Sequence, residues 1–221
     1  MDIKGKGSVL LLLVSTLVLC QNVSSSTCVP REKCEVMLQG LYNNASYLAW
    51  SIRFYGKKAY LDLVNLHYWR STYFLPGRKR CHTADILPRH EHRRARRMQE
   101  KDLLHVVMLL LDSWKEPLPH VAEETHKLMK FYSPIKKKDE SIYLRYQRFK
   151  SVIIEIASKL GLETSVQDFA SWSDMESLKS SDDQTRLFTV YNLLRCFAID
   201  AEKIEFLVYI LKCLADNEDP C

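Results

Sequence analysis

Cysteine is the residue type in this chain whose number and spacing say most about its chemistry. The sequence has seven cysteines, and all except Cys20 follow an apolar N-terminal segment. No two of them form a Cys-x-x-Cys pair and no histidine lies at zinc-finger distance, so we expect no structural metal site. An even number of cysteines in a secreted chain predicts three disulfides, whose pairing the spacing alone leaves open. The candidates are Cys28, Cys34, Cys81, Cys196, Cys213 and Cys221.

A run of arginines at residues 89–97 is the second feature with chemical potential. It contains Arg89, Arg93, Arg94, Arg96 and Arg97, and the basic residues 78–80 add to the charge just ahead of Cys81. Clustered guanidinium groups suit sulfate groups, so one interpretation is a site for heparan sulfate or another polyanion. Residues 94–97 also have the Arg-x-Arg-Arg form of a proprotein-convertase cleavage site. The third interpretation is an ordinary solvated loop that leads into a helix.

Patterns typical of catalysis are missing from the sequence. It has no glycine-rich phosphate loop, no Gly-x-Ser-x-Gly elbow and no His-Glu-x-x-His motif. Its acidic pairs are adjacent in sequence, and adjacent residues do not face each other on a helix. The net charge of +5 is small for 221 residues and indicates no nucleic-acid partner. We therefore expect a monomeric binding protein that is not an enzyme and uses no cofactor.

The N-terminus has the pattern of a secretory signal peptide. Lys4 and Lys6 precede an apolar run that continues to Leu19, and small residues follow at 24–26. The run is too short for a membrane span of roughly 20 residues, and no later stretch is long and apolar enough. We expect cleavage near Ser25, so that residues 1–25 are the leader and residues 26–221 form one secreted, extracellular domain. In such a chain Asn44 begins a glycosylation sequon.

Four stretches have helical periodicity, and the sparse glycines and prolines leave room for long helices. They cover residues 35–66, about 99–128 with an interruption at Pro117 and Pro119, 141–160, and 181–211 or beyond. In the first stretch one apolar face consists of Leu38, Leu41, Ala45, Leu48, Ile52, Tyr55 and Ala59. Gly161 is typical of a helix C-terminus. Ser181 followed by Gln184 matches a capping box at the start of the fourth helix.

The lengths of the connections restrict the topology. At about 3.3 Å per residue, the link from 133 to 140 is too short to return along a helix of about 45 Å. The helices on either side of it must be antiparallel. The links at 67–98 and 162–180 are long enough to join parallel helices. This order of long, short and long connections permits an all-α, up-up-down-down four-helix bundle of the long-chain cytokine type with two crossovers.

Several motifs resemble the prolactin, growth hormone and placental lactogen family. The segment CFAIDAEKIEFLVYILKC at 196–213 resembles the family's C-terminal signature, and YNLLR at 191–195 is similar to prolactin. The similarity to prolactin extends to residues 81–83, residues 110–118, Trp172 and the leader at 10–21. The resemblance covers almost the whole chain. It implies the up-up-down-down bundle and the disulfides Cys81–Cys196, Cys28–Cys34 and Cys213–Cys221.

The resemblance also implies that the chain binds single-span cytokine-type receptors through two surfaces. Site one uses the first and fourth helices with part of the first crossover, and site two uses the first and third helices. The site one candidates are Trp50, Arg53, Glu202, Lys203, Glu205 and Tyr209, and the site two candidate is Ser151, where prolactin has glycine.

Several of these positions depart from a lactogenic hormone. Trp50 and Arg53 stand where prolactins have two histidines, and Glu202 replaces another histidine. Ala198 and Ile199 replace a basic pair. We therefore expect no high-affinity binding to the prolactin receptor, and the chain is most similar to non-lactogenic placental prolactin-related proteins. The alternative is a secreted, matrix-bound protein that acts through its arginine-rich segment.

Overall fold

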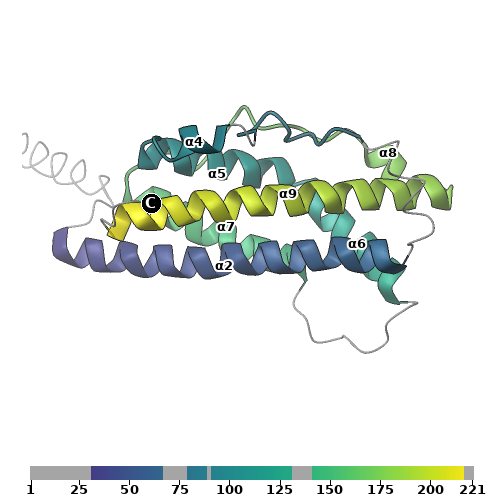
Figure 1. The fold of residues 1–221 in the computed structure, drawn as a ribbon, viewed down its shortest axis with the longest axis horizontal. Coiled ribbons are helices and arrows are strands. Elements are labelled where there is room, and N and C mark those ends of the chain that lie inside the picture. The colour runs from purple at the N-terminus through teal and green to yellow at the C-terminus, as the bar shows by residue number, and fades with distance from the viewer. Residues whose placement is uncertain (1–30, 67–78, 89–90, 131–140, 217–221) are drawn as a thin grey trace, which may run out of the picture.

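The computed structural model describes residues 31–66, 79–88, 91–130 and 141–216. Within these ranges the regular structure is helical and contains no strand, which confirms the all-α prediction. The elements are α2 (Arg31–Leu66), α4 (His92–Ala95), α5 (Glu100–Trp114), α6 (Pro117–Lys130), α7 (Ile142–Lys159), α8 (Met175–Leu178) and α9 (Asp183–Asp216). The long helices form an elongated bundle (Figure 1). The predicted leader at 1–25 lies outside the described residues.

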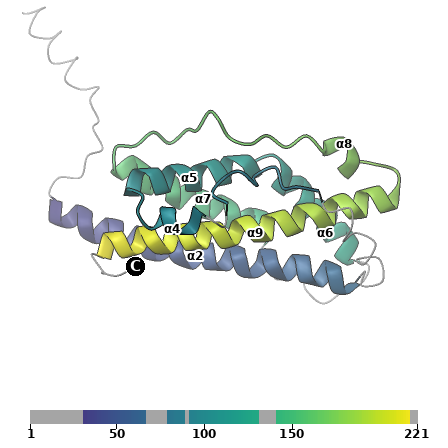
Figure 2. The same ribbon diagram turned by 45° about the horizontal axis from the view of Figure 1, so that its top comes forward.

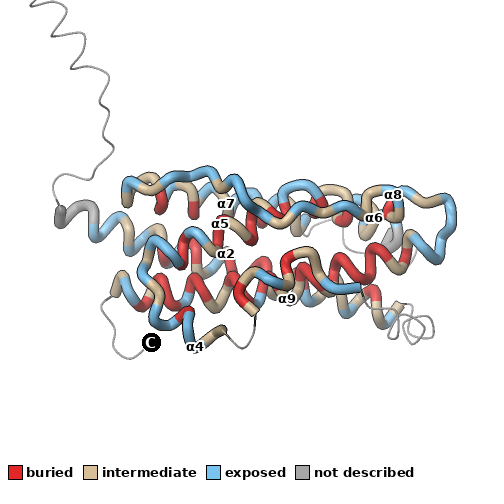
Figure 3. Tube along the Cα trace, turned by 90° about the horizontal axis from the view of Figure 1, so that it is seen from above, coloured by how far each residue is buried: buried red, intermediate tan, exposed pale blue. Residues whose placement is uncertain are grey.

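Helix α9 is the central element of the bundle. It packs against α2 along much of its length and also contacts α5, α6 and α8. Its buried residues lie on almost every side, as expected for a helix surrounded by others. Gly56 of α2 allows close approach here, because a Cβ at this position would lie 3.0 Å from the ring of Phe197. Figure 3 shows the buried positions of the long helices facing the interior of the bundle.

The helix boundaries agree closely with the predicted periodicity. The second predicted helix is divided at Pro117 into α5 and α6, as expected. Ser141 caps α7 by accepting a hydrogen bond from the backbone N–H of Leu144 at 3.2 Å. Gly161 ends α7 with a φ of 68°, in the left-handed region that glycine adopts without a Cβ penalty. The C-terminal glycine prediction is therefore confirmed.

The start of α9 differs from the prediction. A capping box at Ser181 is wrong, because the helix begins at Asp183 and the carboxylate of Asp182 accepts the backbone N–H of Thr185 at 2.9 Å. Aspartate and serine are equally good caps, so the sequence permitted either residue. The short helices α4 and α8 are also additions, each of only four residues within a predicted connection.

Two connecting segments run along the outside of the bundle. Residues 79–88 form turns against α9, and residues 160–174 extend from the end of α7 to α8 (Figure 2). None of the helices within the described ranges is long and apolar enough to cross a membrane.

Candidate functional site

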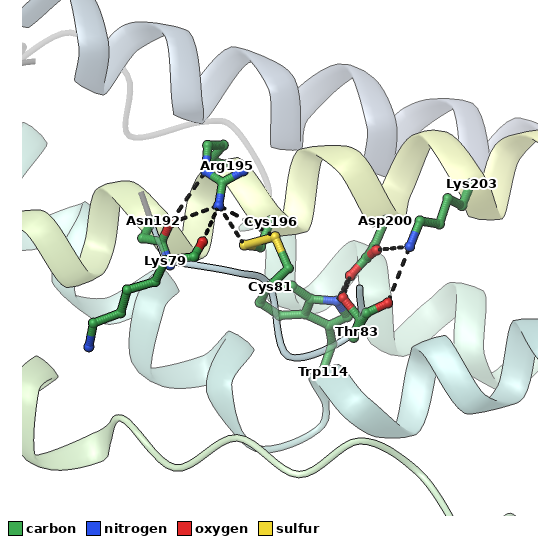
Figure 4. The surroundings of a disulfide bond; sticks show 9 residues. All are labelled: Lys79, Cys81, Thr83, Trp114, Asn192, Arg195, Cys196, Asp200 and Lys203. Carbon is green, nitrogen blue, oxygen red and sulfur yellow. Dashed lines mark hydrogen bonds and ion pairs between the residues drawn. A yellow bond between two sulfur atoms is a disulfide. The ribbon is translucent and has the colours of Figure 1, made fainter. Parts of the chain in front are cut away.

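A disulfide attaches the first connecting segment to α9. Cys81 is bonded to Cys196, with the two Cα atoms 5.5 Å apart and a separation of 115 positions in sequence. The guanidinium of Arg195 lies beside both sulfur atoms and donates hydrogen bonds to the carbonyl of Lys79 at 2.7 Å and to Asn192 at 2.9 Å (Figure 4). The crossover therefore has both a covalent and a polar attachment at this point.

The two terminal disulfides remain predictions. Cys213 is buried near the end of α9, but its predicted partner Cys221 lies outside the described residues. Cys28, the predicted partner of Cys34, also lies outside the described residues.

A buried carboxylate next to the disulfide connects three parts of the fold. Asp200 of α9 accepts a hydrogen bond from Trp114 Nε1 of α5 at 2.8 Å and another from the hydroxyl of Thr83 in the crossover (Figure 4). Lys203 is 3.0 Å from the same carboxylate and donates to the carbonyl of Ile86 at 2.9 Å. Asp200 is only 1% exposed and Lys203 only 6% exposed. The pair thus joins α9, α5 and the crossover in the interior.

This arrangement changes the interpretation of Lys203. As a site one candidate it was expected to present its charge to a receptor, but its ammonium group is inside the protein and satisfied by Asp200 and two crossover carbonyls. The reason is tertiary, because residues 79–88 cover this side of α9. Lys203 therefore holds the crossover against α9 from the inside, and its charge is not presented on the receptor-facing surface.

His82 of the crossover lies against Ser113 and Trp114 of α5, next to the Asp200–Lys203 pair. Its Nε2 is 3.1 Å from the carbonyl of Ser113, and its ring contacts the edge of Trp114 at a centroid distance of 4.9 Å. Burial is the main cause that lowers the pKa of His82, and the Ser113 carbonyl and Asp200 oppose the shift only in part.

The neutral form of His82 is therefore favoured in the folded state, and stability should decrease as the pH falls below about 6.5, where the unfolded chain takes up the proton. We expect His82→Gln to remove part of the difference in the free energy of unfolding between pH 7.5 and pH 5.5. Urea titrations at the two pH values measure this difference. His105→Gln is the matched control, because His105 is exposed. An identical pH dependence in wild type and His82→Gln would contradict the assignment.

The outer face of α2 carries three stacked aromatic side chains. Tyr47, Trp50 and Phe54 are 62%, 44% and 48% exposed, and their ring centroids are 6.1 Å and 5.5 Å apart in sequence order. We call these three residues the aromatic ridge. Their spacing of three and four residues places them on one helix face. Sequence reasoning identified Trp50 alone, although the same spacing rule could have found Tyr47 and Phe54.

The direction of the aromatic ridge follows from the contacts that α2 makes with α9 on one side and with α7 on the other. Arg53 forms an ion pair with Glu205 of α9, on one side of the ridge. On the other side Arg145 of α7 donates a 2.8 Å hydrogen bond to Ser51 and lies 3.8 Å from the ring centroid of Tyr55. The ridge therefore faces outward between α9 and α7.

The remaining receptor candidates lie on the surface of α9 and α7. Glu202 and Tyr209 are exposed on α9, and Glu205 is half-buried in its ion pair with Arg53. This ion pair joins two of the predicted site one residues directly across α2 and α9. Ser151 is exposed on α7, and its hydroxyl donates to the carbonyl of Gln147 of the same helix at 3.0 Å. Asn44 is exposed on α2, and its glycosylation stays a prediction.

The arginine-rich segment forms α4 and the turn that follows it. Arg93, Arg94, Arg96 and Arg97 are all exposed, whereas Arg89 lies outside the described residues. In the described part of the chain, no group of three or more metal-binding side chains comes together.

A bundle of long helices joined through long crossover connections is the architecture of the growth hormone and cytokine bundles. The family model described as the somatotropin hormone family matches residues 12–221. Prolactin-7D1 of Mus musculus is 31% identical to this chain over 233 residues, covering 98% of the chain and 95% of that relative. The chain belongs to the somatotropin and prolactin family of hormones. Hormones of this family are secreted and bind cytokine receptors.

Proposed function

We propose that this protein is a secreted hormone that acts by binding a single-span, cytokine-type receptor through the outer surface of α2 and α9. The proposal depends above all on the aromatic ridge. Three stacked aromatic side chains that are exposed to water form an apolar patch of the kind that marks an interaction surface. Burying them against a partner would stabilise the complex through the hydrophobic effect.

The physical chemistry of protein interfaces supports this choice of surface. Binding energy is concentrated in a few central side chains, among which tryptophan and tyrosine are enriched. Trp50 lies at the centre of the ridge, with Tyr47 and Phe54 stacked on either side. The Arg53–Glu205 ion pair beside it joins α2 to α9, which keeps the two halves of the surface in a fixed relation. Such preorganisation reduces the entropic cost of association.

We also propose the up-up-down-down order of the helices. The course of the ribbon supports it, because α2 and α5–α6 run from left to right in Figure 1, whereas α7 and α9 run from right to left. This order is the one in which family hormones present the first and fourth helices side by side, and α2 and α9 form such a pair.

The receptor should differ from the prolactin receptor. The residues that replace the histidines and the basic pair of prolactin are Trp50, Arg53, Glu202, Ala198 and Ile199. Basic or protonatable side chains are thus exchanged for one aromatic, one basic, one acidic and two apolar side chains. A receptor surface that complements basic side chains would leave its own charges unpaired here, which disfavours binding. We also propose that Ser151, on the α2–α7 side, belongs to a second receptor-binding surface.

Alanine substitution of Trp50 and Phe54 tests the proposed surface. We expect the double variant to bind its receptor at least about thirtyfold more weakly, because each lost anchor typically costs about 1–2 kcal/mol. The measurement is surface plasmon resonance against a panel of single-span cytokine-receptor ectodomains, with the prolactin receptor as the expected negative.

Phe169→Ala is the matched control, since Phe169 is a 41% exposed aromatic residue of the second crossover. It should leave the affinity unchanged. Equal losses from Phe169→Ala and from the ridge variant, or tight binding to the prolactin receptor, would contradict the proposal.

A further inference from the structure

Residues 92–98 of the arginine-rich segment pack on α9 through defined contacts. Ala95 is fully buried, and the ring of His92 stacks on that of Phe206 with a centroid distance of 4.8 Å and an interplanar angle of 23°. The guanidinium of Arg96 lies 5.7 Å from the centre of the same ring. Backbone hydrogen bonds from Arg97 to Arg94 and from Met98 to Ala95 close the following turn. The segment is therefore a formed structural element.

The opposite side of this element presents three arginines around a shallow hollow. Arg93, Arg94 and Arg97 line it together with Glu91. Arg94 is 3.6 Å from the Glu91 carboxylate, whereas Arg93 and Arg97 make no ion pair with any residue in the described ranges. Three guanidinium groups thus face one carboxylate. The hollow carries excess positive charge that the described part of the protein does not neutralise.

The neighbouring basic residues do not add to this group. Lys79 is bonded to Asp174 at 2.9 Å and Arg80 to Asp85 at 2.5 Å. Neither residue lines the hollow and each has a carboxylate partner, so we leave both out of the proposed site. Arg96 is directed to Phe206. The charge available to a ligand is concentrated on Arg93, Arg94 and Arg97.

We propose that Arg93, Arg94 and Arg97 form a binding site for a sulfated glycosaminoglycan chain. The planar guanidinium fork binds tetrahedral oxyanions with paired hydrogen bonds, and several forks on a fixed backbone bind successive sulfates at a reduced entropic cost. The Cys81–Cys196 disulfide implies an oxidising compartment, where sulfated polysaccharides are the abundant polyanions. The site is distinct from the aromatic ridge, so it concentrates the hormone on a matrix independently of receptor binding.

Binding of a size-defined heparin oligosaccharide tests the site by isothermal titration calorimetry. We expect the triple variant Arg93→Ala, Arg94→Ala and Arg97→Ala to bind at least about tenfold more weakly. Glu91→Gln should strengthen binding by about twofold or more, because it removes the carboxylate that competes for Arg94. The wild-type affinity should fall with increasing salt, with a log–log slope of about −2 for three neutralised charges.

The control variant replaces Lys57, Lys115 and Lys179 with alanine, which removes the same charge from exposed positions elsewhere. It should bind nearly as wild type, and circular dichroism should show that both triple variants are folded. The proposal is overturned if the lysine variant loses as much affinity as the arginine variant. Undiminished binding of chemically desulfated heparin, or equal affinity for single-stranded DNA, would also overturn it.

Discussion

Replacement of Asp200 by asparagine is expected to lower the free energy of unfolding by about 3–5 kcal/mol. The substitution keeps the shape of the side chain and an oxygen that can accept from Trp114 and Thr83. It removes the negative charge, so the ammonium of Lys203 remains buried without its counterion. The cost arises from that uncompensated charge and not from a cavity. Urea denaturation should show a lower midpoint with an unchanged slope.

A second variant separates this mechanism from general damage to the core. In Asp200→Asn combined with Lys203→Met both charges are removed, and much of the lost stability should return, because replacing a buried ion pair by uncharged groups is often nearly neutral. Glu155→Gln is the control for removal of an exposed carboxylate and should change stability by no more than about 0.5 kcal/mol. A loss below about 1 kcal/mol in the Asp200 variant would show that the pair is not buried.

Removal of the Cys81–Cys196 disulfide has the other large expected effect. The double alanine variant should lose about 4–5 kcal/mol, because the bond closes a loop of more than a hundred residues and restricts the unfolded chain. The measurement is the free energy of unfolding in urea under non-reducing conditions. Near-ultraviolet circular dichroism should retain the Trp114 signal, since Thr83, Asp200 and Lys203 still hold the crossover against α9.

Reductant distinguishes this bond from the two predicted terminal disulfides. Dithiothreitol should destabilise the wild type by nearly as much as the double substitution and should have a small effect on the variant, because the terminal bonds would close only short loops. A variant as stable as the oxidised wild type would show that the bond contributes nothing, and a large further loss on reduction would assign the stabilisation to the other cysteines.

Sequence periodicity predicted the helices well because helix formation depends on local spacing. The apolar positions of residues 35–66 and 141–160 repeat every three or four residues, and α2 and α7 follow them closely. Gly161 and the break at Pro117 were predictable for the same reason, since backbone restrictions act within one turn. The prediction was less accurate for Tyr55, assigned to the apolar face, which is half-buried beneath Arg145.

The candidate site was predictable only in part. Comparison with family positions identified four candidates that lie on the surface or at its edge, namely Trp50, Arg53, Glu202 and Tyr209. Lys203 came from the same comparison and is buried. The difference between Lys203 and Glu202 is invisible in the sequence, because it depends on which side of α9 the crossover covers.

The sequence by itself determined the helical segments, the break at Pro117, the helix end at Gly161, and the family to which the chain belongs. These properties depend on residues a few positions apart or on recognisable local motifs. Only the tertiary structure decided that Tyr47, Trp50 and Phe54 face outward between α9 and α7, and that Lys203 is satisfied inside. Periodicity states which side chains share a helix face, whereas the segment that covers that face can come from a hundred residues away.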